Sequence, residues 1–178
     1  MIPVSVIVIF QAGNIPSRGV FCAGRVLQGE MTPGGGLEVF CQGKSSKINV
    51  REMEIFRRVA DTLQAGDRGG AFVKMKPEIE LKRGAVIYDP KLKLTPRDEL
   101  EVSLVSVSGE KAIKGDSVLF HSTSTDGKIP IPVGNVTEIS DSKESLLKLK
   151  LSQKILARPS DKFILRNNQN FFKGVVLN

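Results

Sequence analysis

Two short motifs in the chain have the residue types that bind phosphate. Gly43-Lys44-Ser45 looks like the end of a phosphate-binding loop. That loop requires a glycine five residues before Gly43, so that backbone amides wrap the phosphates, and the position holds Glu38. The motif also lies between two predicted strands, whereas the loop must open a helix whose N-terminus attracts the anion. Asp67-Arg68-Gly69-Gly70 has the form of a DxxG switch element, which arises by chance in most chains. Neither motif supports nucleotide hydrolysis, and the sequence does not predict it.

The remaining candidates for catalysis are a histidine, two cysteines and pairs of carboxylates. His121 is the only histidine, and it lies in the apolar run VLFHSTS, where a hydrogen-bonded structural histidine is the commoner outcome. One histidine with the separated Cys22 and Cys41 does not make a closed zinc site, and no EF-hand spacing occurs. Glu52 and Glu54 would share one face of a strand, where solvated surface is the default interpretation. The sequence therefore predicts no enzymatic activity, no metal site and no cofactor.

The elements that must position these residues are short β-strands. Long helical periodicity is absent, and β-branched runs interrupted by Gly, Pro, Asn and Asp recur along the 178 residues, which is typical of barrels or sandwiches. The clearest half-buried strand alternates Leu147, Leu149 and Leu151 with polar residues. Residues 89–96, DPKLKLTP, carry two prolines and no core pattern. We therefore predict an all-β protein with a domain boundary in that segment.

Several local features follow from the same patterns. Residues 2–10 are apolar enough to predict a strand covered on both faces, and Gly24 predicts a bulge or a close approach of another backbone. Residues 44–47 predict a polar hairpin tip, and the slip of apolar parity between Leu104 and Val105 predicts a bulge. Residues 129–133 alternate Ile and Pro, which predicts an edge strand or no strand, because proline lacks an amide proton.

Charge and composition limit the class of partner and the compartment. The chain has 26 Lys and Arg against 19 Asp and Glu, and the resulting net charge of +7 is spread evenly along it. Such a charge either keeps the protein soluble or suits a polyanionic partner. Aromatic residues make up only 6% of the chain and none is tryptophan, which weakens the hypothesis of a platform on which bases of single-stranded nucleic acid stack. Two cysteines in apolar runs favour a reducing cytoplasm. The apolar run at the N-terminus, about eight residues, is too short to span a bilayer, which takes roughly 20, so no membrane partner is predicted.

The segment of residues 53–87, MEIFRRVADTLQAGDRGGAFVKMKPEIELKRGAVI, resembles the second domain of elongation factor Tu. That domain carries EMF or EMH, an arginine, a spacer, AGDNVG, an apolar strand and a segment ending in ERG. The upstream RGVFCAGRVLQGEMTPGGGLEVF is similar to its GTVVTGRV strand and glycine-rich turn. The matching positions in this chain are Glu54, Phe56, Arg57, Ala65, Gly66, Asp67, Gly70, Arg83 and Gly84.

Arg68 points to one branch of the translational GTPases. It stands where elongation factor Tu has an asparagine, and an arginine there is similar to the selenocysteine-specific elongation factors. The later segments KGDSVLFHSTS, LLKLKLSQKILARPSDKFILR and KGVVLN resemble the third domain of those factors. Ser5-Val6 and Cys22 depart from the Asp-Arg and histidine of that branch. The resemblance implies two consecutive β-barrels without the GTPase domain: a translation-factor domain II-like barrel over 1–90, a linker over 91–96, and a barrel over 97–178 like the C-terminal barrel of elongation factor Tu.

The resemblance also implies a function, a non-catalytic module that binds RNA, either a tRNA acceptor end or the ribosome, or another translation component. In such a site Glu54 and Phe56 contact the terminal ribose and base, while Arg57 and Arg68 face phosphate or aminoacyl charge. The competing interpretation is that Glu54 and Arg57 are surface charges, Phe56 is core and Arg68 supports a loop. Two further hypotheses are a protein-binding scaffold for a separate GTPase or a ribosomal partner, and an excised fragment of a longer elongation-factor GTPase.

Overall fold

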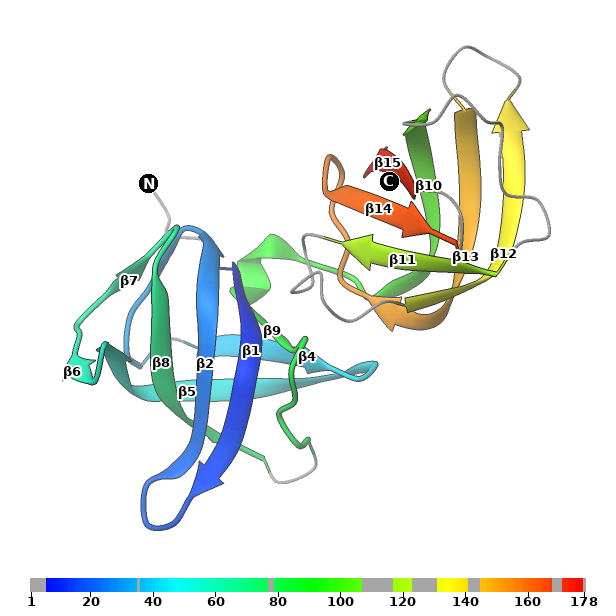
Figure 1. Ribbon diagram of the computed structural model, residues 1–178. Coiled ribbons are helices and arrows are strands. Elements are labelled where there is room, and N and C mark those ends of the chain that lie inside the picture. Colours follow the sequence, from blue (N-terminus) through cyan, green and yellow to red (C-terminus); the bar gives the residue numbers. More distant parts are fainter. Residues whose placement is uncertain are drawn as a thin grey trace. The chain divides into compact units, whose positions relative to one another are not determined.

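The protein is composed of β-strands arranged in two units (Figure 1). The computed structural model describes residues 6–34, 36–76, 79–106, 117–122, 131–140, 145–167 and 171–177. Over these residues the one helical element is a 3-10 turn, η1 (Pro90–Leu92), which follows Asp89, whose side chain accepts a hydrogen bond from the amide of Lys91 at 2.9 Å. The chain divides into the compact units Met1–Lys93 and Leu94–Asn178. The prediction of an all-β fold with two barrels is confirmed.

The first unit is a sheet that closes on itself. Its strands follow the order β4-β9-β1-β2-β8-β5-β6, and a further pairing between β4 and β5 joins the two ends, leaving β6 as an appendage. A separate short pair, β3 with β7, lies beside this ring. The strands are β1 (Val6–Ile15), β2 (Gly19–Gln28), β3 (Glu30–Met31), β4 (Gly36–Cys41), β5 (Lys44–Ile55), β6 (Arg58–Val59), β7 (Leu63–Gln64), β8 (Arg68–Met75) and β9 (Val86–Tyr88).

Alternating apolar residues of these strands fill the inside of the first barrel. Ile9, Val39, Met53 and Ile87 are buried there with 1% or less of their surface exposed. Gly24 lies where β2 passes closest to β1: a Cβ at this position would stand 2.6 Å from the carbonyl oxygen of Val8. The close approach predicted at this glycine is therefore present, and the bulge lies opposite it in β1, between Ile9 and Gln11.

The second unit is a closed antiparallel barrel with the strand order β10-β13-β12-β11-β14-β15. Leu147, Leu149 and Leu151 point into its core with 3%, 0% and 2% of their surface exposed, which confirms the predicted half-buried strand. Phe120 and Phe163 stack in the same core with ring centroids 5.1 Å apart. The strands are β10 (Arg97–Ser106), β11 (Val118–Ser122), β12 (Ile131–Ser140), β13 (Ser145–Ile155), β14 (Lys162–Arg166) and β15 (Phe171–Val176).

Two local predictions are wrong. The hairpin tip expected over 44–47 lies two residues earlier, at Gln42 and Gly43, because both have the positive φ that a two-residue turn requires. Strand β5 then begins at Lys44. The bulge expected near Val105 does not form, since Val105 pairs with Lys173 in unbroken register; the register shift of β10 lies at its start.

Two of the predicted segments lie partly outside the described residues. Val6, Val8 and their neighbours in the first strand are buried in succession, as a strand covered on both faces requires, while residues 2–5 lie outside the described residues. Of the predicted segment 129–133, residues 129 and 130 lie outside the described residues, while Pro132 belongs to β12 and pairs with Leu119 of β11. On its other side the pairing with β13 begins only at Val133, so the proline occupies a local edge where no amide proton is needed.

Candidate functional site

The hairpin between β5 and β6 presents an aromatic ring to solvent. Ile55 pairs with Arg58, and the two residues between them, Phe56 and Arg57, have φ values of 48° and 64°. Positive φ at both central residues is the geometry of a type I′ turn, which favours asparagine and glycine. Phe56 is 94% exposed, so it is not a core residue. The fold holds a phenylalanine at a strained position without burying its ring.

Glu54 connects this turn to the sheet. It pairs with Gly70 of β8 on one side and with Val59 of β6 on the other. Because the register of β5 and β8 is antiparallel, counting on by two residues from this pair brings Phe56 and Arg68 to the same end of the two strands. Glu54, the Phe56-Arg57 turn and Arg68 therefore lie together at one end of the β5–β8 pair, although these four residues are spread over 15 positions of the sequence.

The turn before Arg68 is held by its neighbour Asp67. The carboxylate of Asp67 accepts a hydrogen bond from the amide of Gln64 at 2.8 Å, and its carbonyl accepts one from the amide of Val26 at 3.0 Å. Gly66, at a φ of 101°, donates its amide to the carbonyl of Val26. These contacts hold the loop, and none of them involves the side chain of Arg68. That side chain is exposed, so its guanidinium does not support the loop.

Two residues that lie beside Arg68 carry no signal in the sequence. Arg25 of β2 is the direct cross-strand partner of Arg68 of β8, and its side chain is also exposed. Phe10, in the bulge of β1, lies with its ring centroid 6.0 Å from the guanidinium carbon of Arg68. The GRV run at residues 24–26 contains Arg25, but only the register of β2 against β8 shows that the two arginines are neighbours.

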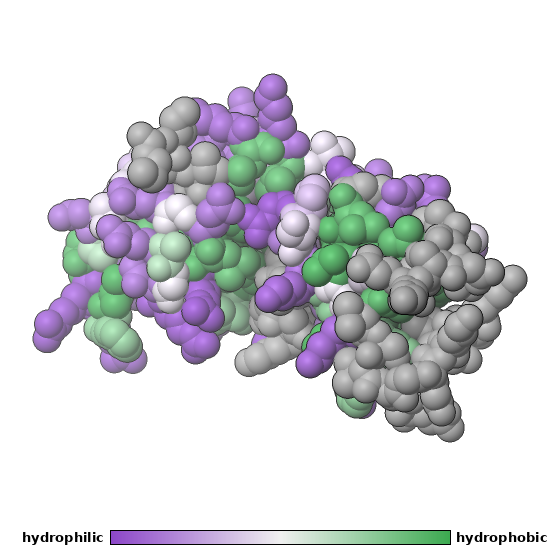
Figure 2. All heavy atoms as spheres, turned by 90° about the horizontal axis from the view of Figure 1, so that it is seen from above, coloured by the Kyte–Doolittle hydropathy of each residue, from purple (hydrophilic) through white to green (hydrophobic). Residues whose placement is uncertain are grey.

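The rest of this sheet face is packed around Arg18 and two phenylalanine rings. Over the side of the molecule drawn in Figure 2, hydrophobic and hydrophilic residues are interspersed. The guanidinium of Arg18 lies 3.7 Å from the ring centroid of Phe72 and 2.5 Å from a carboxylate oxygen of Glu52. The rings of Phe21 and Phe72 lie 5.1 Å apart. A Cβ on Gly70 would stand 2.5 Å from Phe21, so the glycine makes room for that ring. The face is therefore closed around Arg18 and open around Arg68.

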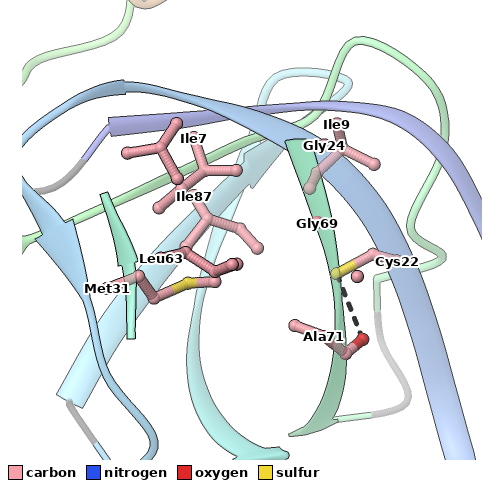
Figure 3. Close-up of a pocket in the computed structure, with 11 residues that line it drawn as sticks. Ile7, Ile9, Cys22, Gly24, Met31, Leu63, Gly69, Ala71 and Ile87 are labelled. Atoms are coloured by element: carbon pink, nitrogen blue, oxygen red, sulfur yellow. Dashed lines mark hydrogen bonds between the residues drawn. The ribbon is translucent and has the colours of Figure 1, made fainter. Parts of the chain in front are cut away.

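The described residues inside the first barrel surround a cavity that is too small for a ligand. The cavity has a volume of about 10 Å³, the room of a single water molecule, and Figure 3 shows the apolar side chains around it, with the Cys22 thiol directed at the carbonyl oxygen of Ala71 at 3.6 Å. Burial raises the pKa of the Cys22 thiol to about 12, so it is a neutral packing group at physiological pH.

Catalytic groups do not gather elsewhere among the described residues. His121 is half-buried in β11, paired with Ile164 of β14. No group of three His, Cys, Asp or Glu side chains in the described ranges could hold a metal ion. The same ranges contain no helix with the length and apolarity to cross a membrane.

Comparisons with known proteins identify the fold. No family model matches the chain. Its structure is similar to the apo form of translation elongation factor SelB from Methanococcus maripaludis, with a TM-score of 0.79 and 16% sequence identity. The match covers 100% of this chain and 43% of the elongation factor, so the chain spans less than half the length of that protein. The resemblance to the barrels of selenocysteine-type elongation factors is therefore confirmed at the level of fold over the whole chain.

Proposed function

We propose that the chain is a non-catalytic translation-factor-like module that binds RNA at the end of the β5–β8 pair. In this proposal residues 1–90 correspond to a domain II-like barrel, 91–96 to a linker and 97–178 to a domain III-like barrel. The observation that carries it is Phe56, an aromatic residue 94% exposed in a turn of positive φ. A protein retains such a residue at a cost in stability, and residues held in this way cluster at functional sites.

The chemistry of the four residues suits the end of an RNA strand. An exposed aromatic ring stacks on a base, which contributes about 1–3 kcal/mol per base. Arg57 and Arg68 carry charges for phosphate or an aminoacyl group, and the carboxylate of Glu54 accepts a hydrogen bond from a ribose hydroxyl. We propose a tRNA acceptor end or ribosomal RNA as the ligand and the reducing cytoplasm, suited to the free thiols of Cys22 and Cys41, as the compartment.

Binding of unfractionated deacylated tRNA at several salt concentrations tests this proposal. We expect Arg68→Ala to weaken binding and to reduce the slope of log K against log salt by about 0.7–0.9, the share of one phosphate contact. Phe56→Ala should weaken binding without changing that slope. Arg51→Ala, which removes an exposed charge elsewhere on β5, is the matched control. Absence of tRNA binding, or binding indifferent to Arg68, contradicts the proposal.

A second candidate function is a scaffold that binds a separate GTPase or a ribosomal protein. The observation that favours it is a set of apolar residues on the outside of the second barrel: Ile164, Phe171 and Val175 are 39%, 55% and 36% exposed on β14 and β15. Exposed apolar residues on neighbouring strands mark protein interaction sites when they form a patch. Affinity purification from cell extract distinguishes the two candidates, because recovery of nucleic acid with no specific protein counts against a scaffold.

A further inference from the structure

We propose that Arg25 and Arg68 together form a binding site for one phosphate group on the outside of the first barrel. The inference rests on the proposed function for the identity of the ligand, a backbone phosphate of RNA, and it extends the candidate site from β5 and β8 to β2. The two arginines are direct cross-strand partners in the β2–β8 pair, so their side chains leave the same face of the sheet. Both side chains are exposed.

Two like charges in this arrangement repel each other unless an anion lies between them. In the described part of the chain neither guanidinium forms an ion pair with a carboxylate. The other cross-strand neighbour of Arg25 is Val8 of β1, which carries no charge. The repulsion is therefore not relieved by the described residues, and an external anion would relieve it.

Arg18, at the other end of the same face, provides an internal comparison. Its guanidinium is used by the fold itself, stacked 3.7 Å from the centroid of Phe72 and paired with Glu52. Arg25 and Arg68 lack a carboxylate of this kind among the described residues, and the contact of Arg68 with Phe10, at 6.0 Å, is a loose one. The fold therefore satisfies one arginine of this face and leaves two neighbouring ones available for a ligand.

The spacing fits a single phosphate. Side chains directly opposite on antiparallel strands have Cβ atoms about 4.5–5.5 Å apart, within the reach of two guanidinium groups that donate to different oxygens of one phosphate. Guanidinium groups match phosphate oxygens in a bidentate geometry that lysine cannot reproduce. Phe10 lies on the β1 side of Arg68, and its contact at 6.0 Å is too loose to hold the guanidinium away from an anion.

Two measurements on the full chain test the site. The first is tRNA binding by Arg25→Gln, Arg68→Gln and the double variant, with Arg51→Gln as the matched loss of one exposed charge. We expect each single variant to weaken binding several-fold more than Arg51→Gln does, and the double variant to lose less than the product of the two single losses, because the arginines share one phosphate. Arg25→Lys, which keeps the charge but not the fork, should recover only part of the affinity.

The second measurement follows the side-chain Nε–Hε NMR signals of the arginines during titration with inorganic pyrophosphate. Signals assigned to Arg25 and Arg68 by the two variants should shift together while that of Arg51 does not. If tRNA binds but Arg25→Gln behaves like Arg51→Gln, the inference is overturned and the proposed function stands. If pyrophosphate shifts both signals while tRNA does not bind, the paired site stands as an anion site and the proposed RNA function falls. If neither ligand binds, both are overturned.

Discussion

The Phe56-Arg57 turn should limit the stability of the first unit, and replacing it should reveal by how much. Both residues have positive φ, and an L-residue in this conformation costs roughly 1–2 kcal/mol. Phe56→Asn with Arg57→Gly installs the residues that a type I′ turn prefers. Glycine loses more conformational entropy on folding than other residues do, and this loss offsets about 0.5–1 kcal/mol of the strain that is relieved. The relief at two positions is about 2–4 kcal/mol, so the net gain expected for the pair of substitutions is about 1–3.5 kcal/mol in the free energy of unfolding.

The chain contains its own control for this calculation. The turn between β4 and β5 has the same length and also positive φ at both residues, but it uses Gln42 and Gly43. No atom lies within 4 Å of a Cβ placed on Gly43, so Gly43→Ala changes the backbone preference without a clash. This variant should lose about 1 kcal/mol of stability, the opposite sign to the change at the β5–β6 turn.

Native-state hydrogen exchange of amides in β5 and β8 is the appropriate assay, because it reports the first unit separately from the second. A gain of 1 kcal/mol corresponds to about 4–8 °C in the midpoint of thermal unfolding for a unit of this size. The same variant should lose tRNA binding, since it removes the exposed ring and one charge. An unchanged exchange rate would show that the turn is not strained, and retained tRNA binding would remove Phe56 and Arg57 from the site.

Two further predictions concern packing in the two barrels. Gly174→Ala should destabilise the second unit by about 2 kcal/mol or more, because the new Cβ would overlap the carbonyl oxygen of Ser103 and the buried ring of Phe163. Urea unfolding measures the loss, with Gly13→Ala as the uncrowded control, and equal stability of the two variants would contradict the close approach. Burial raises the pKa of the Cys22 thiol from 9.0 to about 12, so the folded state binds the thiol proton more tightly than the unfolded state does. The stability that this proton contributes is fully present below pH 9 and is lost as pH rises toward 12, so wild type should lose at most about 1.4 kcal/mol per pH unit above pH 9 relative to Cys22→Ala. Parallel pH profiles of the two proteins would refute the burial of the thiol.

Local sequence signals account for much of the fold. Strands in the second barrel follow from strict alternation, as at Leu147 to Leu151, because one face must enter the core while the other meets water. Gly24 was predicted as a place of close backbone approach because a strand interior otherwise disfavours glycine. These signals are readable because each depends on a few consecutive residues.

The position of turns and the register of strands are harder to predict from the sequence. Polar residues at 44–47 looked like a hairpin tip, yet the backbone turns at Gln42 and Gly43, since a conformation of positive φ determines a two-residue turn more strongly than polarity does. Residue pattern alone favours a core position for Phe56, because aromatic residues in strand-like runs are usually buried, and only the resemblance to a known domain predicts the exposed ring.

The neighbourhood of Arg68 could be predicted only in part. The resemblance to a known domain identified Glu54, Phe56, Arg57 and Arg68 as candidates that the sheet then brings to one end of β5 and β8. Arg25 remained hidden, because it lies 43 residues before Arg68 and only cross-strand pairing relates them. Pairing is decided by the whole ring of strands, and a single sequence carries little information about it.

The closure of the first barrel determines when this unit can fold during synthesis. Strand β9 is only three residues long, yet it pairs with β1 through Val6 to Val8 and with β4 through Glu38 to Phe40. Until Tyr88 leaves the ribosomal exit tunnel, β1 and β4 each expose a strand edge, the feature that promotes aggregation of nascent chains. The first unit therefore completes its fold only after residue 88 has emerged, and the two edges stay open to other chains up to that point.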